Sequence, residues 1–294
     1  MASLAEEDEY EEISNEEKVK IATHFLLSSP PGEIKEVEKD ISRIVPSSAL
    51  GEETVASTFR KYNLDNFTVA KTPEGTSMLV CAAGEVDESH YTDPRSKKTY
   101  GFDHKAQTWT GEASDEFPTD ESVEELRAAT QVAMDEYLSS FFNDESKALS
   151  AAAVYGKGGN LEIRVSGVAS DLRNYWSGGW RSNYTVSISG GNSASVSGSV
   201  KLIAHYFEDG NVQMNTSNEF QGTTISFTDG ANLAGAVKEQ ISTFESDLHN
   251  ELSSVYTRMS ADTFKDMRRI LPITKQKFDW SGVQSKLNSN LKSS

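Results

Sequence analysis

The sequence predicts an α+β fold in which three helices precede an antiparallel β-sheet that is covered by one long helix. Three observations support this prediction: amphipathic helical spacing over residues 14–63, alternation of apolar and polar residues over 151–228, and an apolar stripe over 232–259. A basic amphipathic tail ends the 294-residue chain. With 36% apolar residues, the chain can bury a sizeable core.

The first part of the chain predicts an acidic segment and then a helical stalk. Residues 1–17 carry eight acidic side chains and no basic one, so residues 1–13 are expected to be disordered. Ser14 and Glu17 have capping-box spacing, which starts the first of three helices in 14–63. The third helix is expected over residues 52–62. The positions expected to face inward are Val19, Ile21, Ala22, Phe25, Leu26, Ile34, Val37, Ile41, Ile44, Val55, Phe59 and Tyr62.

Residues 64–120 are predicted to be a small β region with a connector. Short β-like pieces are separated by Gly, Ser and Asp-Pro clusters, and Asp93-Pro94 indicates a turn between two of them. Residues 109–120 are polar and are expected to be the connector. The β-like pieces are 67–69, 78–82 and 99–102.

Residues 121–263 are predicted to form a helix, the main sheet and the long helix. The first helix is expected over 122–142. Five or six strands follow as an antiparallel meander, because short turns rich in Gly, Asn and Asp, including the hairpin signal Asp209-Gly210, separate them. Over 232–259 the apolar residues recur every three or four positions: Leu233, Val237, Ile241, Phe244, Leu248, Leu252, Val255 and Met259.

The length of this last helix suggests a dimer. At 1.5 Å per residue it spans roughly 40 Å, whereas five strands at ~4.8 Å each make a narrower sheet. A helix that overhangs its own sheet is explained by a second sheet joined to the first at its edge. The alternative is a helix that simply projects from the fold.

Residues 264–294 differ from the rest in charge and pattern. They hold seven basic and two acidic residues, which is a net charge of +5. The whole chain has a net charge of −17, so residues 1–263 have a net charge of −22. From Trp280 the apolar residues Val283, Leu287 and Leu291 follow at steps of three, four and four, which places them on one helical face. The pattern favours a mobile helix that docks on another surface. The alternative is a last helix packed on its own domain.

Composition excludes several classes of function. The acidic charge argues against nucleic-acid binding, and a single cysteine, Cys81, allows neither an intrachain disulfide nor a thiolate metal cluster. We find no signal peptide and no apolar run long enough for a membrane helix, which predicts a soluble protein of the cytoplasm.

No constellation of catalytic or metal-binding residues is visible, so we predict neither enzyme activity nor a cofactor or metal. The five histidines lack ligand spacing, and Gly156-Lys157 lacks a phosphate-loop frame. One aromatic cluster is interpreted as core or interface packing, the alternative being a platform for a sugar or a peptide. It consists of Tyr175, Trp176, Trp180 and Tyr184.

Several motifs resemble one family. Residues 204–212 (AHYFEDGNV) are similar to the signature VH-aromatic-aromatic-EDGNV of the F-actin capping protein alpha subunit, with Ala204 in place of valine. Residues 264–272 (FKDMRRILP) resemble its second signature, FK-x-L-RR-x-LP, with Asp266 and Met267 as departures. Shorter matches in the same order are PPGE at 30–33, DPR at 93–95, FDH at 102–104, VYGK at 154–157, WSGGWRS at 176–182 and DW at 279–280.

The resemblance implies a heterodimer in which the sheet continues into a capping protein beta subunit. The implied activity is binding to the barbed end of an actin filament, which places the protein at the cytoskeleton, with the tail as a mobile tentacle. It also implies inhibition by phosphoinositides and other acidic phospholipids through Lys265 and Arg269. The implied actin-binding residues are Lys265, Arg268, Arg269, Lys275, Lys277, Trp280, Val283, Leu287 and Leu291. The alternative is a phosphoinositide-binding adaptor at a membrane surface that binds actin secondarily.

Overall fold

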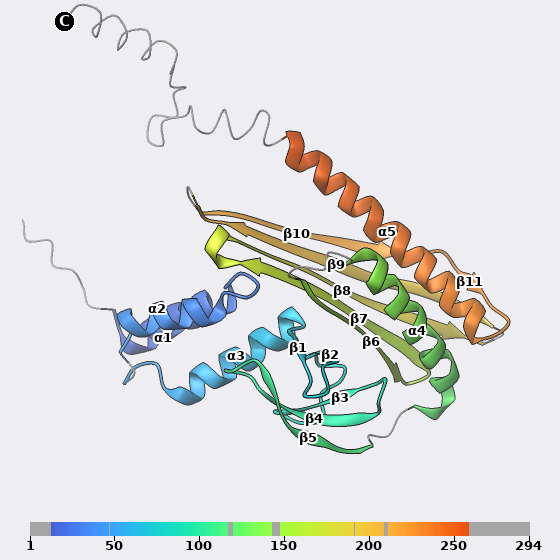
Figure 1. Cartoon of the computed structure of the whole chain (residues 1–294), viewed down its shortest axis with the longest axis horizontal. Coiled ribbons are helices and arrows are strands. Elements are labelled where there is room, and N and C mark those ends of the chain that lie inside the picture. Colours follow the sequence, from blue (N-terminus) through green and yellow to red (C-terminus); the bar gives the residue numbers. More distant parts are fainter. Residues whose placement is uncertain are drawn as a thin grey trace, which may run out of the picture. The chain divides into compact units, whose positions relative to one another are not determined.

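The structure is a computed structural model of the whole chain (Figure 1), and it divides into two compact units. The first comprises residues 1–240 and the second residues 241–294. The structure describes residues 13–46, 48–116, 120–142, 148–190, 192–208 and 211–258. The acidic segment expected at the N-terminus, apart from Ile13, and the basic tail lie outside the described residues.

The N-terminal stalk contains three helices, as the sequence predicts: α1 (Asn15–Leu27), α2 (Ile34–Ile44) and α3 (Glu52–Asn66). The capping box at Ser14 and Glu17 is present. Three residues expected to face inward are exposed instead, namely Ile21 (47%), Phe25 (56%) and Ile44 (80%), because the helices pack through a narrower stripe. The buried core of the stalk is Ala22, Leu26, Ile34, Ile41, Leu50, Val55, Phe59 and Tyr62.

The middle region forms two small sheets around an aromatic core. One sheet pairs β1 (Val69–Lys71) with β2 (Ser77–Leu79), and the other has the order β3 (His90–Asp93), β4 (Lys98–Asp103), β5 (Thr108–Glu116). Its core contains Tyr91, Tyr100, Phe102 and Trp109.

The prediction of a connector over 109–120 is wrong for its first part, since β5 occupies residues 108–116. The stretch is mostly polar, but it contains one residue, Trp109, that packs in the core of the middle region. The Trp109 ring packs 4.7 Å from the Phe102 ring, and its indole N–H donates to Ala70 O at 3.0 Å. One buried aromatic residue is thus enough to hold a strand whose sequence is otherwise polar.

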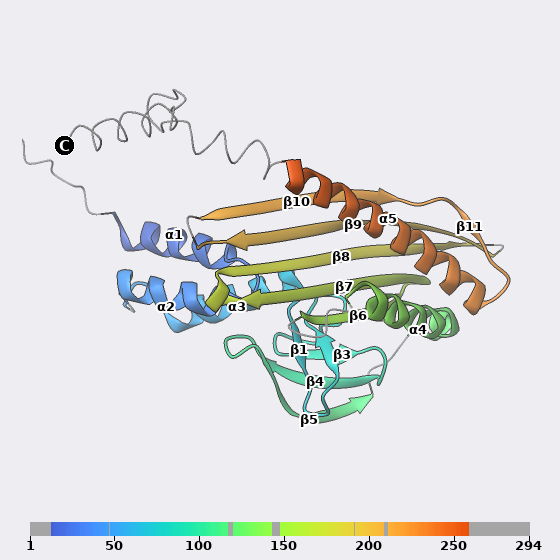
Figure 2. The same cartoon turned by 45° about the horizontal axis from the view of Figure 1, so that its top comes forward.

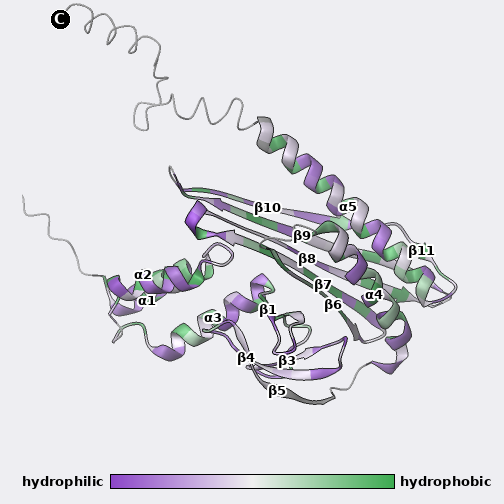
Figure 3. Cartoon of the chain, viewed as in Figure 1, coloured by the Kyte–Doolittle hydropathy of each residue, from purple (hydrophilic) through white to green (hydrophobic). Residues whose placement is uncertain are grey.

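The main sheet is an antiparallel meander of five long strands (Figure 2), and the short β11 (Ile225–Ser226) pairs with β9 beyond the end of β10. Hydrophobic and hydrophilic residues alternate along its strands (Figure 3). The turn after β6 uses Gly158 and Gly159, which both have positive φ. In order across the sheet the long strands are β10 (Val212–Gln221), β9 (Ser193–Tyr206), β8 (Trp176–Ser189), β7 (Asn160–Asp171) and β6 (Ala148–Lys157).

Two 3₁₀ turns and two α-helices complete the described part of the fold. A short 3₁₀ turn, η1 (Glu121–Val123), leads into α4 (Glu124–Phe141), and a second, η2 (Leu172–Asn174), joins β7 to β8. The long helix α5 covers Gly230–Arg258, close to the predicted range, and the Asp229 carboxylate accepts from Asn232 N at 2.8 Å at its start. In the first unit its Leu233 and Val237 are buried; in the second, Ile241 and Leu248 are buried. Among the described residues, no helix is long and apolar enough to cross a bilayer.

Helix α4 closes one edge of the main sheet. Gln131 accepts from Val154 N at 2.8 Å and donates to Ala152 O at 3.1 Å, and Arg127 donates to Val154 O at 3.4 Å. These side chains form hydrogen bonds with backbone groups of β6 that do not take part in its pairing with β7. The sequence pattern gave no indication of this, because Gln131 lies among apolar positions of a helix.

We expect replacement of Gln131 by leucine to lower the free energy of unfolding by about 2 kcal/mol, because Ala152 O and Val154 N then stay buried without their partner. Urea unfolding of the variant and the parent protein measures this difference. Val132→Ala is the matched control: the neighbouring Val132 is 61% exposed, and its truncation is expected to change stability by under about 0.5 kcal/mol. Equal stability of both variants would show that α4 does not seal this edge.

Candidate functional site

A buried polar cluster joins the stalk to the main sheet. The Glu33 carboxylate, at the start of α2, accepts from Ser177 Oγ at 2.5 Å and lies 2.7 Å from His205 Nδ1. The other ring nitrogen of His205 lies 3.2 Å from Asn211 Oδ1, and the ring stacks on Phe207 at 4.8 Å. We call Glu33, Ser177 and His205 the junction cluster. Its three members come from three of the motifs noted in the sequence.

Close packing supports the same junction. A Cβ on Gly179 would lie 2.7 Å from Pro31 Cγ, so the WSGG motif needs glycine where the PPGE motif approaches the sheet. The Tyr62 hydroxyl donates to Pro30 O at 3.0 Å from α3. Burial raises the Tyr62 pKa above its ordinary value, which keeps the hydroxyl protonated as a donor.

Two other motifs also have structural roles. In FDH, His104 Nε2 lies 3.1 Å from the Tyr91 hydroxyl and its Nδ1 lies 3.2 Å from Asn63 Nδ2. Burial lowers the His104 pKa, so the ring is neutral at pH 7. In DPR, the Asp93 carboxylate accepts from Arg95 N at 3.2 Å, which confirms the predicted turn. These motifs hold the middle region together.

The other edge of the main sheet, along β10, is open. Among the described residues β10 pairs with β9 alone, over ten residues without a bulge. At about 3.3 Å per residue this edge is about 33 Å long. Its sequence, VQMNTSNEFQ, contains no Lys, Arg or Pro, which are the residues that commonly protect an edge strand from pairing. The strand is therefore suited to pairing with a strand of another chain.

The sequence-predicted binding residues cannot be compared with this geometry. Lys265, Arg268, Arg269, Lys275 and Lys277 lie outside the described residues, as do the apolar residues of the tail. Those are Trp280, Val283, Leu287 and Leu291.

The interpretation of the aromatic cluster as core packing is confirmed for Trp180 and Tyr184 but not for Tyr175. Trp180 and Tyr184 are buried in the sheet, Trp176 is half-buried, and Tyr175 is 45% exposed. In the described part of the chain no group of three or more His, Cys, Asp or Glu side chains could hold a metal ion. Cys81 is buried and its thiol donates to the Tyr155 hydroxyl at 3.6 Å; burial raises the Cys81 pKa, which disfavours the thiolate.

Sequence reasoning found the motifs of the junction cluster but not their contacts. Glu33 and His205 are 172 residues apart, and no local pattern pairs them. The available signal was an acidic residue in an otherwise apolar Pro-Pro-Gly turn and a histidine at an inward position of a strand.

Comparison with known proteins identifies relatives over nearly the whole chain. The sequence profile of the family described as F-actin capping protein alpha subunit matches residues 22–290. The F-actin-capping protein subunit alpha of Dictyostelium discoideum is 35% identical over 92% of this chain and 96% of its own length. That of Arabidopsis thaliana is 32% identical over 95% and 94%. The homodimeric actin capping protein alpha subunit from Plasmodium berghei has a similar fold, with a TM-score of 0.73 and 24% identity over 88% of this chain and 98% of that chain.

We expect Glu33→Ala to lower the free energy of unfolding by about 3 kcal/mol, because Ser177 and His205 lose a buried charged partner. Denaturant unfolding gives the value. Glu33→Gln keeps an acceptor oxygen, so its free energy of unfolding is expected to fall by less. Glu36→Ala is the control, since Glu36 makes an exposed ion pair with Lys39 and its removal is expected to cost under about 1 kcal/mol. A Glu33→Ala variant as stable as this control would contradict a junction role.

Proposed function

The chain belongs to the F-actin capping protein alpha subunit family, and on this basis we propose that it is one subunit of a dimer that binds the barbed end of an actin filament and blocks subunit addition and loss. The family consists of actin-binding proteins rather than enzymes. The observation that carries the proposal is the match over residues 22–290, which includes most of the basic tail. The proposed location is the cytoplasm, at the actin cytoskeleton.

The open β10 edge supports the dimer. We propose that a capping protein beta subunit adds a strand there, so that one sheet runs through both subunits. Strand addition satisfies the unpaired backbone groups along the edge, and the exposed side chains at alternate positions provide specificity. The closed edge at β6 leaves β10 as the place for this pairing among the described strands.

A homodimer is the second candidate, because the Plasmodium berghei relative is described as homodimeric. Both assemblies use an exposed strand edge, but only the homodimer forms from this chain alone. Without any partner strand we expect the chain to be unstable or to aggregate, because the β10 edge stays unpaired. A soluble, cooperatively unfolding monomer would contradict that expectation.

Hydrogen exchange tests the pairing. We expect amides of residues 212–221 to exchange at least tenfold more slowly in the complex with the beta subunit than in the chain alone at low concentration, because outward N–H groups become bonded. Residues 148–157 are the internal control, since α4 already covers that edge. Protection that grows with the concentration of this chain alone would identify the homodimer. Unchanged exchange over 212–221 in either dimer would contradict pairing through β10.

For capping itself, we propose that the tail makes the contact with actin. The basic residues Lys265, Arg268, Arg269, Lys275 and Lys277 face an acidic actin surface, which speeds encounter. The apolar residues Trp280, Val283, Leu287 and Leu291 become buried on contact, which slows dissociation. Burial of Trp280 and the two leucines contributes on the order of 5 kcal/mol before ordering costs.

Barbed-end elongation from filament seeds tests this mechanism. We expect substoichiometric dimer with the full-length chain to stop growth, and dimer with a chain ending at Ala261 to do so at least a hundredfold less well, because both classes of tail residue are lost. Equal capping by both would show that the tail is not the contact. If neither dimer caps, the proposal that this family member blocks barbed ends is wrong.

The alternative is an adaptor at a membrane surface that binds phosphoinositides first, with Lys265 and Arg269 as the main contacts. Replacing Trp280 and Leu287 by Asp separates the two functions. Capping should weaken strongly, because apolar burial is lost, while binding to vesicles that contain phosphoinositide should survive in part, because it depends on charge. Loss of vesicle binding with capping intact would contradict both assignments of the tail.

A further inference from the structure

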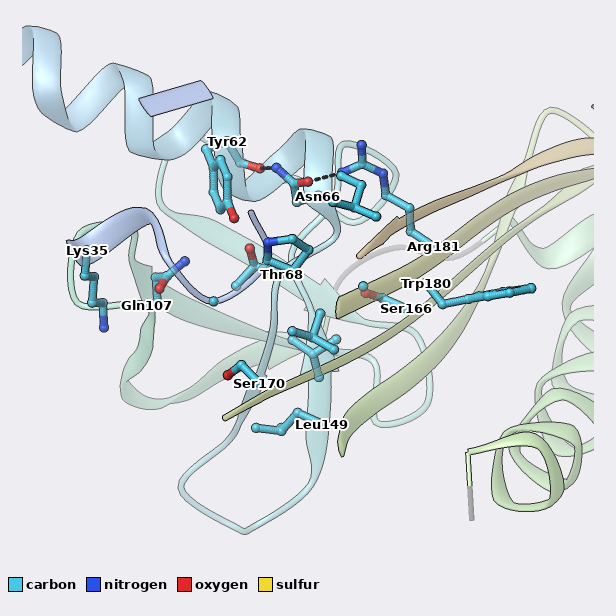
Figure 4. Close-up of a pocket in the computed structure, with 16 residues that line it drawn as sticks. Lys35, Tyr62, Asn66, Thr68, Gln107, Leu149, Ser166, Ser170, Trp180 and Arg181 are labelled. Atoms are coloured by element: carbon cyan, nitrogen blue, oxygen red, sulfur yellow. Dashed lines mark hydrogen bonds between the residues drawn. The ribbon is translucent and has the colours of Figure 1, made fainter. Parts of the chain in front are cut away.

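A cavity of about 260 Å³ lies between the stalk and the main sheet (Figure 4). Lys35 and Tyr62 line it from the stalk, and Ser166 and Arg181 line it from the sheet. Its volume lies near the lower end of the range for small-molecule sites. Among the described residues that line the cavity there is no Asp or Glu, although the chain as a whole carries −17.

In the described part of the chain the hydroxyl of Ser166 has no hydrogen-bond partner. Ser166 is fully buried (0% exposed), and its Oγ points into the cavity (Figure 4). A buried hydroxyl without a hydrogen-bond partner costs free energy. Its position at a cavity therefore indicates a ligand that forms the missing hydrogen bond.

Arg181 brings positive charge to the same wall. It lies opposite Ser166 on β7 and opposite Lys201 on β9, so two cations stand side by side in the sheet. The guanidinium donates to Asn66 Oδ1, and Asn66 Nδ2 donates in turn to Tyr62 O at 2.8 Å (Figure 4). Burial lowers the Arg181 pKa, although Asp65 acts in the opposite direction, so an anion beside the guanidinium would favour its charged form.

Apolar side chains lie beside these polar groups on the sheet and face them from the stalk. Pro31, Val168 and Ile203 line the cavity together with the polar groups, which suits a ligand that has a short hydrophobic body. A guanidinium presents paired N–H donors that match the two oxygens of a carboxylate.

We propose that this cavity binds a small organic acid, whose carboxylate contacts Arg181 and Ser166 and whose apolar part lies against Pro31, Val168 and Ile203. The ligand bridges the stalk and the sheet, because both line the cavity. Its binding therefore stabilises the junction and raises the unfolding temperature. No residue of β10 lines this site, and its test measures ligand binding rather than capping.

The test uses the full-length protein in the dimer that it forms, with benzoate as the probe and benzamide as its neutral counterpart of the same shape. Saturation-transfer NMR and thermal unfolding report binding. We expect benzoate to bind at least tenfold more tightly than benzamide and to raise the unfolding temperature. Equal binding of the two probes, or no binding of benzoate, overturns the proposal. Inorganic phosphate that binds as tightly as benzoate overturns the role of Pro31, Val168 and Ile203.

Variants assign the site. We expect Ser166→Ala and Arg181→Gln each to weaken benzoate binding at least fivefold. Without ligand, Ser166→Ala should unfold at the same temperature as the parent or higher, because it removes an unpartnered buried hydroxyl. Thr130→Val is the matched control, since Thr130 on α4 is also buried with an unpartnered hydroxyl but does not line the cavity. Equal affinity of the Ser166→Ala and Thr130→Val variants contradicts the assignment.

Discussion

The buried carboxylate of Glu33 is the contact on which the arrangement of the first unit depends. A charge taken out of water needs fixed partners, and Glu33 has them in Ser177 and His205, on two neighbouring strands. The stalk cannot shift along the sheet without leaving that charge unpaired. The nearby glycine at 179 lets Pro31 approach the sheet closely enough for these bonds to form.

The two edges of the main sheet show why the fold suits assembly. At β6 the side chains of Arg127 and Gln131 bond to the strand, so this edge offers no free backbone groups there. At β10 ten residues pair, among the described strands, with β9 alone, and the strand has no Lys, Arg or Pro to protect that edge. A monomer with both edges open would aggregate in either direction, whereas one closed edge limits association to a single direction. The asymmetry fits a closed pair of subunits rather than a fibre.

Local pattern predicted the elements well where one residue type dominates. The alternation of apolar and polar residues over 151–228 identified the main sheet, and the spacing after residue 232 identified α5. The prediction of a connector over residues 109–120 failed, because the polar composition did not show that Trp109 packs in the core and that β5 begins there. Ile21 and Phe25 fit a helical pattern yet remain exposed, because spacing alone does not show how wide a helix interface is. The junction cluster needed tertiary information, since its partners are far apart in sequence.

The charge distribution limits how such a chain approaches its target. Residues 1–263 carry −22 and the last 31 residues carry +5. At physiological ionic strength, charges are screened beyond about 8 Å, so each region acts mainly on surfaces close to it. In the proposed capping reaction, an acidic filament end repels the body and attracts the tail, so the tail arrives first. Once contact is made, apolar burial determines how long the complex lasts, so charge and hydrophobic contact govern different steps of the proposed capping reaction.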